Sequence, residues 1–451
     1  MTISAVGFIS ITICIYIVIK NIGHLDFLTR RTIEICIITG IFLDIGYVLK
    51  IGDFECEYNY LFTGVAFFIA LLTKQLRMLK KRELILFVLP VYLFAVVAIR
   101  EISGIEFLSC SYSGVTWDQS LRMKSLNTIT ASIEQIIMPI IRLLMMGIIL
   151  IIFCRKYDRE RINELCNKIY QASKIYAVFI LIEIIWSNLF GSELRNLIYT
   201  VFGESGSTTL EYRRFLGINA PLGLAREPSN FALSCFIISL VLYYNYRTKK
   251  ERRCKGLMCF YLALLVVSGS VSGLLYLLAL AFLFLCSSSF NTRRNVYYVL
   301  PILGGIGAFA VNHMYSYRIQ LLINEFSRFS KGIEDLTFNS TINRMYSIYN
   351  NIMCFFKVPI LGTGLGTVYS FSCIVTLITN LGIVGTILFV MFYMGNIEKK
   401  FGDKKSSILV CLFLVIAFSC TGHMGYILYY SQLFFVTVIG TLLLKKESIK
   451  R

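Results

Sequence analysis

The chain has 451 residues, of which 57% are hydrophobic and 16% are charged, and its mean hydropathy is +0.71. These values exclude an ordinary soluble protein, even though the formal net charge is +18. Apolar runs long enough to cross about 30 Å of hydrocarbon recur along the whole length. The composition therefore predicts an all-α polytopic membrane protein in which residues 1–451 form a single integral membrane domain.

The apolar runs predict thirteen membrane-spanning helices, and short or adjacent runs widen the expected number to about 12–14. The first run follows no basic residue and precedes no small-residue cleavage site, so we expect a span and not a signal peptide. The predicted spans lie near residues 3–19, 33–49, 58–73, 84–99, 128–153, 174–190, 229–246, 257–269, 271–288, 297–312, 371–394, 408–420 and 427–444.

Lys and Arg residues are unevenly divided between the two sets of loops that alternate along these spans. One set holds about 30 of the 44 basic residues, and the positive-inside rule makes that set cytoplasmic. The N-terminus is then expected outside and the C-terminus in the cytoplasm. Basic patches such as KQLRMLKKRE are interpreted as topology signals that touch anionic headgroups. No basic face alternates with stacking aromatic residues, so nucleic acid is not an expected partner.

Two predicted external loops are much longer than the others, at about 191–228 and 313–370. Long loops with structure of their own are usually functional. The second loop holds two amphipathic helical patterns that are expected on the outer membrane surface. They are marked by Ile319, Leu322, Ile323 and Phe326, and by Ile342, Met345, Tyr349, Ile352 and Phe356.

The first long loop ends in LAREPSNFA, which predicts a helix start at Pro228. Proline suits the first helical position because it lacks the N–H that would be unsatisfied there. Arg226 and Glu227 are then fixed where a membrane helix meets water, beside a helix N-terminus that attracts phosphate. This arrangement suits chemistry on a lipid-linked phosphate.

Arg213, Arg214 and Arg226 place three permanent cations within a short external stretch, and Arg344 lies on the polar side of the second amphipathic pattern. Guanidinium groups match phosphate oxygens bidentately, so these arginines are candidates for binding a pyrophosphate. A structural alternative is that they hold lipid headgroups or pair with nearby carboxylates, Glu211 and Glu227.

Glu227 has two interpretations that the residues alone leave open. Its carboxylate could deprotonate or orient a sugar hydroxyl, or it could cap the helix and pair with Arg226. Adjacent arginines push a carboxyl pKa downward, which favours the cap over the base.

Further candidate residues lie in a glycine-rich loop, near the end of a span and within spans. Gly362 and Gly364 belong to GTGLG, a bent loop with backbone donors, and His423 stands near the outer end of a span, where it is either an interfacial polar residue or a proton carrier. We expect four charged residues within spans to face the bundle interior, as cavity lining or as locks between helices. They are Asp44, Glu134, Arg142 and Glu183.

The chain has no P-loop, no Asp-x-Asp, no metal-type cysteine spacing and no nucleophile elbow. An active site on the external face would also meet no nucleotide. The energy for synthesis would have to arrive with the substrate, as it does in a polyprenyl-pyrophosphate sugar.

Four features in order resemble the Wzy-type O-antigen and capsular polysaccharide polymerases, which share a superfamily with O-antigen ligases. They are RRFLG…GLAREPSNFA at the start of a span, SGSVSG two spans later, Arg344 in a large external loop, and PILGTGLG before TLITNLGIVGTILF. The resemblance covers about residues 200–395 and implies a GT-C-like helical fold at the cytoplasmic membrane of a bacterium.

The resemblance also implies a metal-independent glycosyltransferase without cofactors. Its substrates would be undecaprenyl-pyrophosphate-linked repeat units, which it would join into capsule or O-antigen. Arg213 or Arg214, Arg226 and Arg344 would clamp the pyrophosphate, and Glu227 would orient or activate the acceptor. Gly362, Gly364 and His423 are accessory candidates. Membrane lipids are expected partners, with room for a chain-length regulator.

Two alternatives stay open at this point. A flippase or other transporter of lipid-linked oligosaccharides would also have about 12–14 spans, but its external loops would be short. An O-antigen ligase would share the fold and differ in its acceptor. Ligase relatives carry a histidine near the glycine loop, and TVYSFSCIVTLITN has none.

Overall fold

The computed structural model describes residues 2–445 apart from 22, 45–46, 52–53, 57, 73–82, 110–126, 204–213, 216–217, 250, 288–339, 369 and 420–426. The described part is mostly helical. Short antiparallel ladders join β1 to β2 to β3, β4 to β5, and β6 to β7. Their bounds are β1 (Thr2–Ile3), β2 (Leu49–Ile51), β3 (Phe54–Cys56), β4 (Glu106–Ser109), β5 (Asn127–Thr130), β6 (Arg214–Phe215) and β7 (Ile218–Asn219).

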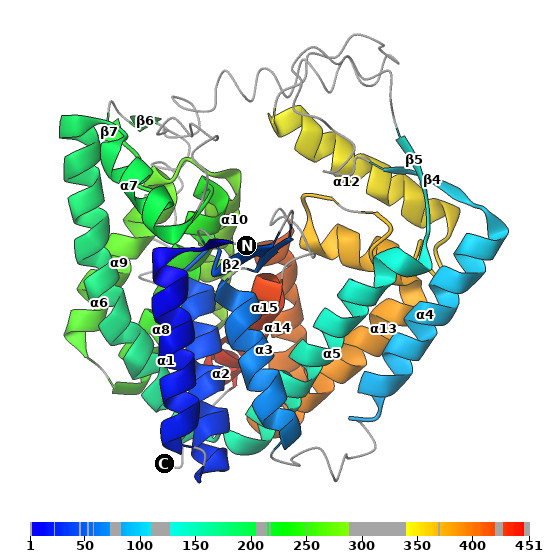
Figure 1. Cartoon of the computed structure of the whole chain (residues 1–451), viewed down its shortest axis with the longest axis horizontal. Helices are drawn as coiled ribbons and strands as arrows, with labels where there is room; N and C mark the ends of the chain where they lie inside the picture. The colour runs from blue at the N-terminus through cyan, green and yellow to red at the C-terminus, as the bar shows by residue number, and fades with distance from the viewer. Residues whose placement is uncertain are drawn as a thin grey trace.

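The helices of the first half are α1 (Ala5–Asn21), α2 (Leu25–Phe42), α3 (Tyr58–Leu72), α4 (Ile85–Ser103), α5 (Ile133–Lys156), α6 (Arg159–Phe190) and α7 (Glu193–Phe202). Those of the second half are α8 (Pro228–Lys249), α9 (Arg252–Val267), α10 (Val271–Ser287), α12 (Ser340–Lys357), α13 (Cys373–Phe401), α14 (Lys404–Phe418) and α15 (Ile427–Leu444). Figure 1 shows α7, β4–β5, β6–β7 and α12 gathered at one end of the helix bundle. Of these, α7, β6–β7 and α12 belong to the two long loops predicted to be external, whereas β5 takes up the first residues of the span predicted at 128–153.

Twelve of the thirteen predicted spans overlap a helix, while the run at 297–312 lies outside the described residues. By length and composition, four described helices could cross a membrane: Ile85–Ser103, Ile136–Lys156, Arg159–Phe190 and Cys373–Phe401. Four shorter apolar helices are Ala5–Asn21, Leu61–Leu72, Ser272–Ser287 and Gln432–Leu444.

The second predicted span, at 33–49, is displaced from the helix that the structure contains. Helix α2 ends at Phe42, because Leu43 is extended (φ −121°, ψ 101°), and the chain then continues into β2. The predicted span therefore runs past the end of α2 and includes Leu49, the first residue of β2. Apolar runs of this kind do not by themselves distinguish strand from helix.

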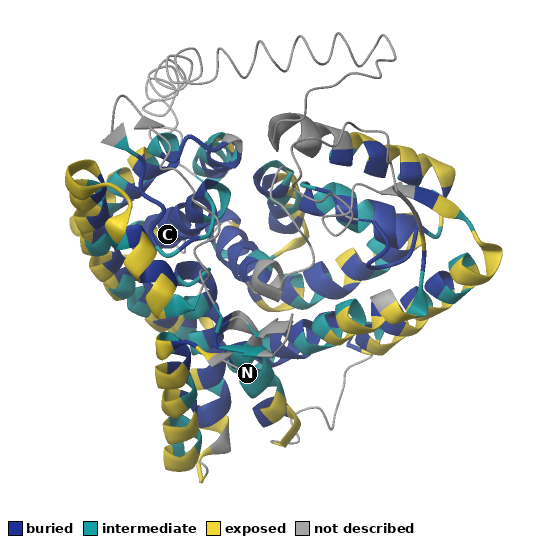
Figure 2. Ribbon diagram, turned by 45° about the horizontal axis from the view of Figure 1, so that its top comes forward, coloured by how far each residue is buried: buried dark blue, intermediate teal, exposed yellow. Residues whose placement is uncertain are grey.

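Helix α8 forms the centre of the bundle and is buried on every side between residues 231 and 245. It packs against α2, α6, α9, α10 and α15. A helix that is apolar all round belongs in a core and not at a surface. Figure 2 shows the same division, with buried residues inside the bundle and exposed ones along its outward sides.

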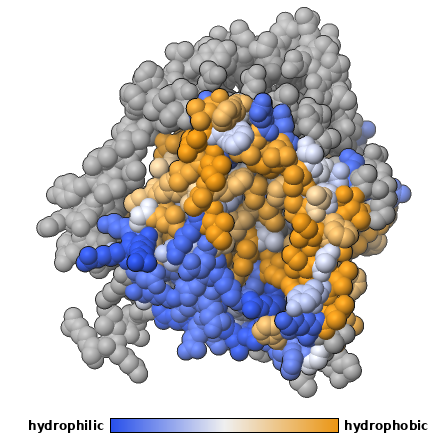
Figure 3. Space-filling model, turned by 60° about the vertical axis from the view of Figure 1, so that its left-hand side comes forward, coloured by the Kyte–Doolittle hydropathy of each residue, from blue (hydrophilic) through white to orange (hydrophobic). Residues whose placement is uncertain are grey.

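The outward sides are themselves apolar, as expected for a surface that faces lipid. On α6 the exposed hydrophobic residues begin at Ile175, and residues 175–190 cover about 24 Å at 1.5 Å per residue. Figure 3 shows a hydrophobic surface above a hydrophilic lower end. The exposed residues of α6 in this stretch are Ile175, Val178, Leu181, Ile182, Ile185, Trp186, Leu189 and Phe190.

Candidate functional site

The start of α8 is where the sequence predicted it, at Pro228. The Glu227 carbonyl accepts hydrogen bonds from the backbone N–H groups of Asn230 (3.1 Å) and Phe231 (3.0 Å), which close the first turn. The Glu227 carboxylate accepts a hydrogen bond from the Ser229 hydroxyl (3.3 Å). Arg226 and Glu227 are both half-buried. The structure thus places the charged pair directly before the N-terminus of α8.

Asp44 brings a second carboxylate to this helix start from the segment after α2. Its Oδ2 accepts from the Asn230 side-chain amide (2.6 Å) and from the Arg226 backbone N–H (3.4 Å). Its own N–H donates to the Leu224 carbonyl (3.0 Å). A carboxylate beside free N–H groups at a helix N-terminus is stabilising. Asp44 is therefore part of the site and not an isolated charge in a span.

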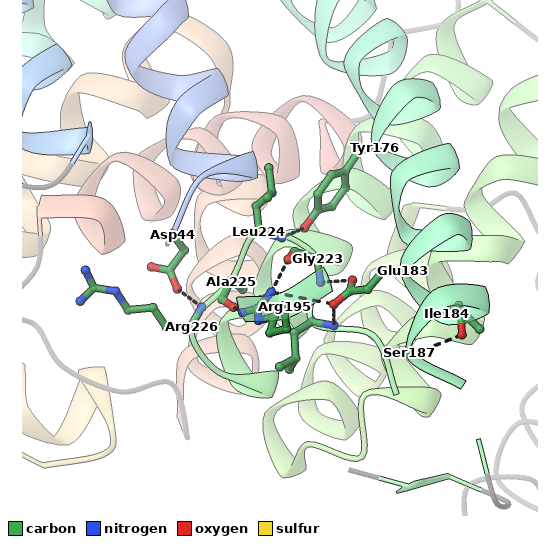
Figure 4. Close-up of polar contacts among 11 residues, drawn as sticks. Asp44, Tyr176, Glu183, Ile184, Ser187, Arg195, Gly223, Leu224, Ala225 and Arg226 are labelled. Atoms are coloured by element: carbon green, nitrogen blue, oxygen red, sulfur yellow. Dashed lines mark hydrogen bonds and ion pairs between the residues drawn. The ribbon is translucent and has the colours of Figure 1, made fainter. Parts of the chain in front are cut away.

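The turn at Leu222–Ala225, just before the charged pair, is held by side chains from α6 and α7. The Glu183 carboxylate accepts from the N–H groups of Leu222 (3.2 Å) and Gly223 (2.7 Å). Arg195 donates to the carbonyl oxygens of Gly223 (2.5 Å) and Ala225. Figure 4 shows these two side chains converging on the turn.

Gly223 is required in this turn for two reasons. Its φ is +58°, which side-chain-bearing residues rarely adopt. A Cβ there would also lie 2.1 Å from the Tyr176 hydroxyl oxygen, which accepts the Leu224 N–H at 3.1 Å. The positive φ and the close approach of Tyr176 together explain why a glycine stands at this position.

The other three charged residues predicted inside spans differ in their surroundings. Glu183 is 0% exposed and pairs with Arg195, as expected for a lock between elements (Nη1–Oε1 3.8 Å). Arg142 is half-buried in α5. The prediction for Glu134 is wrong: it is exposed in the first turn of α5, beside the Ser132 N-cap. Helix α5 begins later than the predicted span, so Glu134 lies at a helix N-terminus, where a carboxylate is favourable.

The glycine loop lies against an interrupted turn of α13. Gly362 (φ +79°) and Gly364 (φ +105°) donate their N–H groups to the carbonyls of Val358 (2.9 Å) and Asn380 (3.1 Å). The Asn380 side chain is buried and exchanges hydrogen bonds with the backbone of Val368. The backbone donors of Gly362 and Gly364 are thus engaged within the protein, which gives this loop a packing role.

Helix α12 confirms the second amphipathic pattern as a helix, and it lies across α13 and beside β4 (Figure 1). Its polarity is reversed relative to a surface helix of a soluble protein. Ser347 and Asn351 are buried, whereas Ile352 and Phe356 are exposed. An apolar outer side is what a helix at a lipid surface presents.

The structure describes the remaining predicted site residues only in part. Arg344 belongs to α12 and Arg214 to β6, but their side chains lie outside the described residues. Arg213 and His423 lie wholly outside them. Convergence of the arginines on one phosphate therefore stays a prediction. Across the described ranges, no three His, Cys, Asp or Glu side chains form a group that could hold a metal ion.

Sequence reasoning missed Arg195 and Asn230, and it did not connect Asp44 with the helix start. Arg195 carried a usable signal. A carboxylate within a span needs a partner, and Arg195 is the next arginine after Glu183 along the chain. Asn230 carried none, because its partner is 186 positions away.

Comparison with known proteins leaves the site to be interpreted from its own geometry. No family model, no curated protein and no solved structure matches the chain. The resemblance to polysaccharide polymerases therefore rests on the sequence motifs alone.

Proposed function

We propose that this protein is a Wzy-type polymerase that joins undecaprenyl-pyrophosphate-linked repeat units into a surface polysaccharide. One observation carries the proposal. Arg226 and Glu227 stand at the start of the central helix α8, directly after a turn whose backbone is fixed by buried side chains. A guanidinium, a carboxylate and a helix N-terminus at one place suit a reaction in which a pyrophosphate leaves a sugar.

In the proposed reaction, the bond between the donor sugar C1 and the pyrophosphate oxygen breaks. A bond from C1 to an acceptor hydroxyl oxygen forms, and the hydroxyl proton passes to a base. Arg226, with Arg213, Arg214 and Arg344, would hold the charge that develops on the leaving pyrophosphate. The carrier supplies the energy, so the proposal needs no nucleotide and no metal.

Glu227 is the proposed acceptor-orienting residue, and proton acceptance would be its second role. Its carboxylate already accepts a hydroxyl hydrogen bond, from Ser229. A sugar hydroxyl offers the same kind of donor. General-base catalysis requires the acceptor hydroxyl within hydrogen-bond reach of this carboxylate.

The surroundings agree with a site at the outer face of the bacterial cytoplasmic membrane. The elements from the predicted external loops lie at one end of the bundle, and the outer side of α12 is apolar (Figure 1). We propose a GT-C-like arrangement with about 12–14 spans, an external N-terminus and a cytoplasmic C-terminus.

The decisive experiment is to delete the gene and identify the lipid-linked species that accumulates, and on which face. A polymerase defect leaves single repeat units on the outer face or on the terminal acceptor. Accumulation on the inner face would instead indicate a flippase. Long chains retained on the carrier would indicate a ligase. Complementation with the unaltered gene is the control that links the species to this protein.

A further inference from the structure

We infer that the buried Glu183–Arg195 pair is a positioning device that fixes the backbone on which Arg226 is carried. The inference rests on the proposed function of Arg226 and goes beyond it. Neither residue is accessible to a substrate, since Glu183 is 0% and Arg195 2% exposed. They act through the turn Leu222–Ala225 and not on the reacting atoms.

The turn has no regular secondary structure, yet each backbone N–H group from Leu222 to Arg226 donates a hydrogen bond. Leu222 and Gly223 donate to Glu183, Leu224 donates to Tyr176, and Ala225 donates to the Leu222 carbonyl (3.1 Å). Asp44 accepts from the next N–H, that of Arg226 (3.4 Å). Buried backbone groups without partners are costly, so this set of contacts specifies one conformation.

The two sides of the Arg226 peptide unit are both held. Arg195 donates to the Ala225 carbonyl, and Asp44 accepts from the Arg226 N–H. Figure 4 shows the Arg226 side chain pointing away from the turn, on the side where Asp44 lies. These two hydrogen bonds fix the orientation of the peptide unit, and with it the direction in which the Arg226 side chain starts from its Cα.

A buried ion pair is poor evidence for stability, because desolvation can cancel the attraction between the charges. Here, however, the contacts of Arg195 also fix the position of the turn. The Arg195 guanidinium reaches two carbonyl oxygens and lies 4.6 Å from the centroid of the Tyr199 ring. An ammonium cannot reproduce such a planar fork. Arg195→Lys therefore keeps the charge but loses the paired contacts with these two carbonyl oxygens.

The matched control is a second largely buried pair far from the site. Arg155, at the end of α5, donates to the Glu83 carboxylate (Nε–Oε1 3.2 Å), and these side chains are 22% and 6% exposed. Arg155→Lys also removes a fork from a carboxylate, but in the last turn of α5 and not at the turn Leu222–Ala225. Both variants would be purified in detergent beside the unaltered protein.

Two measurements would be made. The first is hydrogen–deuterium exchange in peptides covering 220–227, with peptides of the glycine loop at 359–368 as an internal reference. The second is kcat and KM per folded molecule, with a lipid-linked repeat unit as donor. We expect Arg195→Lys to accelerate exchange in 220–227 alone, and to lower kcat and kcat/KM together by about 10- to 100-fold. Arg155→Lys should change neither.

A double variant tests whether Arg195 acts through Arg226. If it does, Arg195→Lys combined with Arg226→Ala should be no slower than Arg226→Ala alone. Normal exchange in Arg195→Lys, or faster exchange with normal turnover per folded molecule, would overturn the inference. If the unaltered protein makes no polymer, the proposed function is wrong, and so is the proposed contribution of the Glu183–Arg195 pair to catalysis. The exchange data would still report whether the pair fixes the turn.

Discussion

Gly362 and Gly382 lie backbone against backbone, although they are in different segments. A Cβ on either one would be 2.4 Å from the amide nitrogen of the other. Both have positive φ, and Gly382 (φ +64°, ψ −175°) interrupts α13. The interruption lets the Ile383 N–H reach the Pro359 carbonyl (2.9 Å). This contact joins the glycine loop to α13.

Gly382→Ala should therefore destabilise the protein by roughly 2–5 kcal/mol, because strain at positive φ adds to a steric clash. Thermal unfolding in detergent and abundance in the membrane measure the loss. Gly395→Ala, on the same helix, is the control, since nothing lies within 4 Å of a Cβ there. Equal stability of the two variants would contradict the observed packing.

Substitutions of Arg226 and Glu227 separate a capping role from a catalytic one. Glu227→Gln still offers an oxygen to Ser229, so a purely structural Glu227 predicts near-normal polymer. If Glu227 accepts the acceptor proton, turnover should fall by about 10²–10⁴-fold at normal abundance. Arg226→Ala should weaken the pyrophosphate clamp and leave single repeat units unjoined.

Polymer length on a gel, measured beside protein abundance in a complemented deletion strain, reads out both substitutions. Normal ladders from Glu227→Gln and from Arg226→Ala, at normal abundance, would remove these residues from the proposed site. Arg213 and Arg214 would then become the leading candidates for binding the phosphate.

Arg344→Lys is expected to fail to restore polymer even though the charge is kept. A bidentate fork on phosphate is not reproduced by an ammonium, while the helix propensities of Arg and Lys are nearly equal. Arg252→Lys, in the first turn of α9 at the predicted cytoplasmic side, is the control and should behave normally. Full-length polymer from Arg344→Lys would reduce Arg344 to a headgroup anchor.

The topology can be tested by cysteine labelling from outside intact cells. A membrane-impermeant reagent should react with cysteines placed at Ser205 and Ser330, in the two long loops predicted to be external. It should miss cysteines at Leu79 and Lys250, in basic loops predicted to be cytoplasmic. Reaction at position 250 would reverse the orientation and move every proposed site residue to the other side.

Local properties of the chain were enough to predict most of the helices. Twelve predicted spans overlap helices, and both Pro228 and the pattern at 342–356 marked real elements. The length of an apolar run and the spacing of apolar residues along a helix involve positions a few residues apart, so a sequence records them directly. The errors fell at the ends of such runs. Helix α2 ends at Phe42, before the end of its predicted span, and Glu134 stands at a helix terminus.

Tertiary structure alone decided how the candidate site is supported. Asp44 meets Asn230, and Glu183 and Arg195 meet the turn at Gly223. These contacts join segments about 30 to 190 positions apart. Local periodicity carries no trace of such distant partners, and Asp44 appeared in the sequence simply as a costly charge. Its partners became visible when α2, α6 and α7 packed around the start of α8, because hydrogen bonds form between groups that are close in space, however far apart they are in the chain.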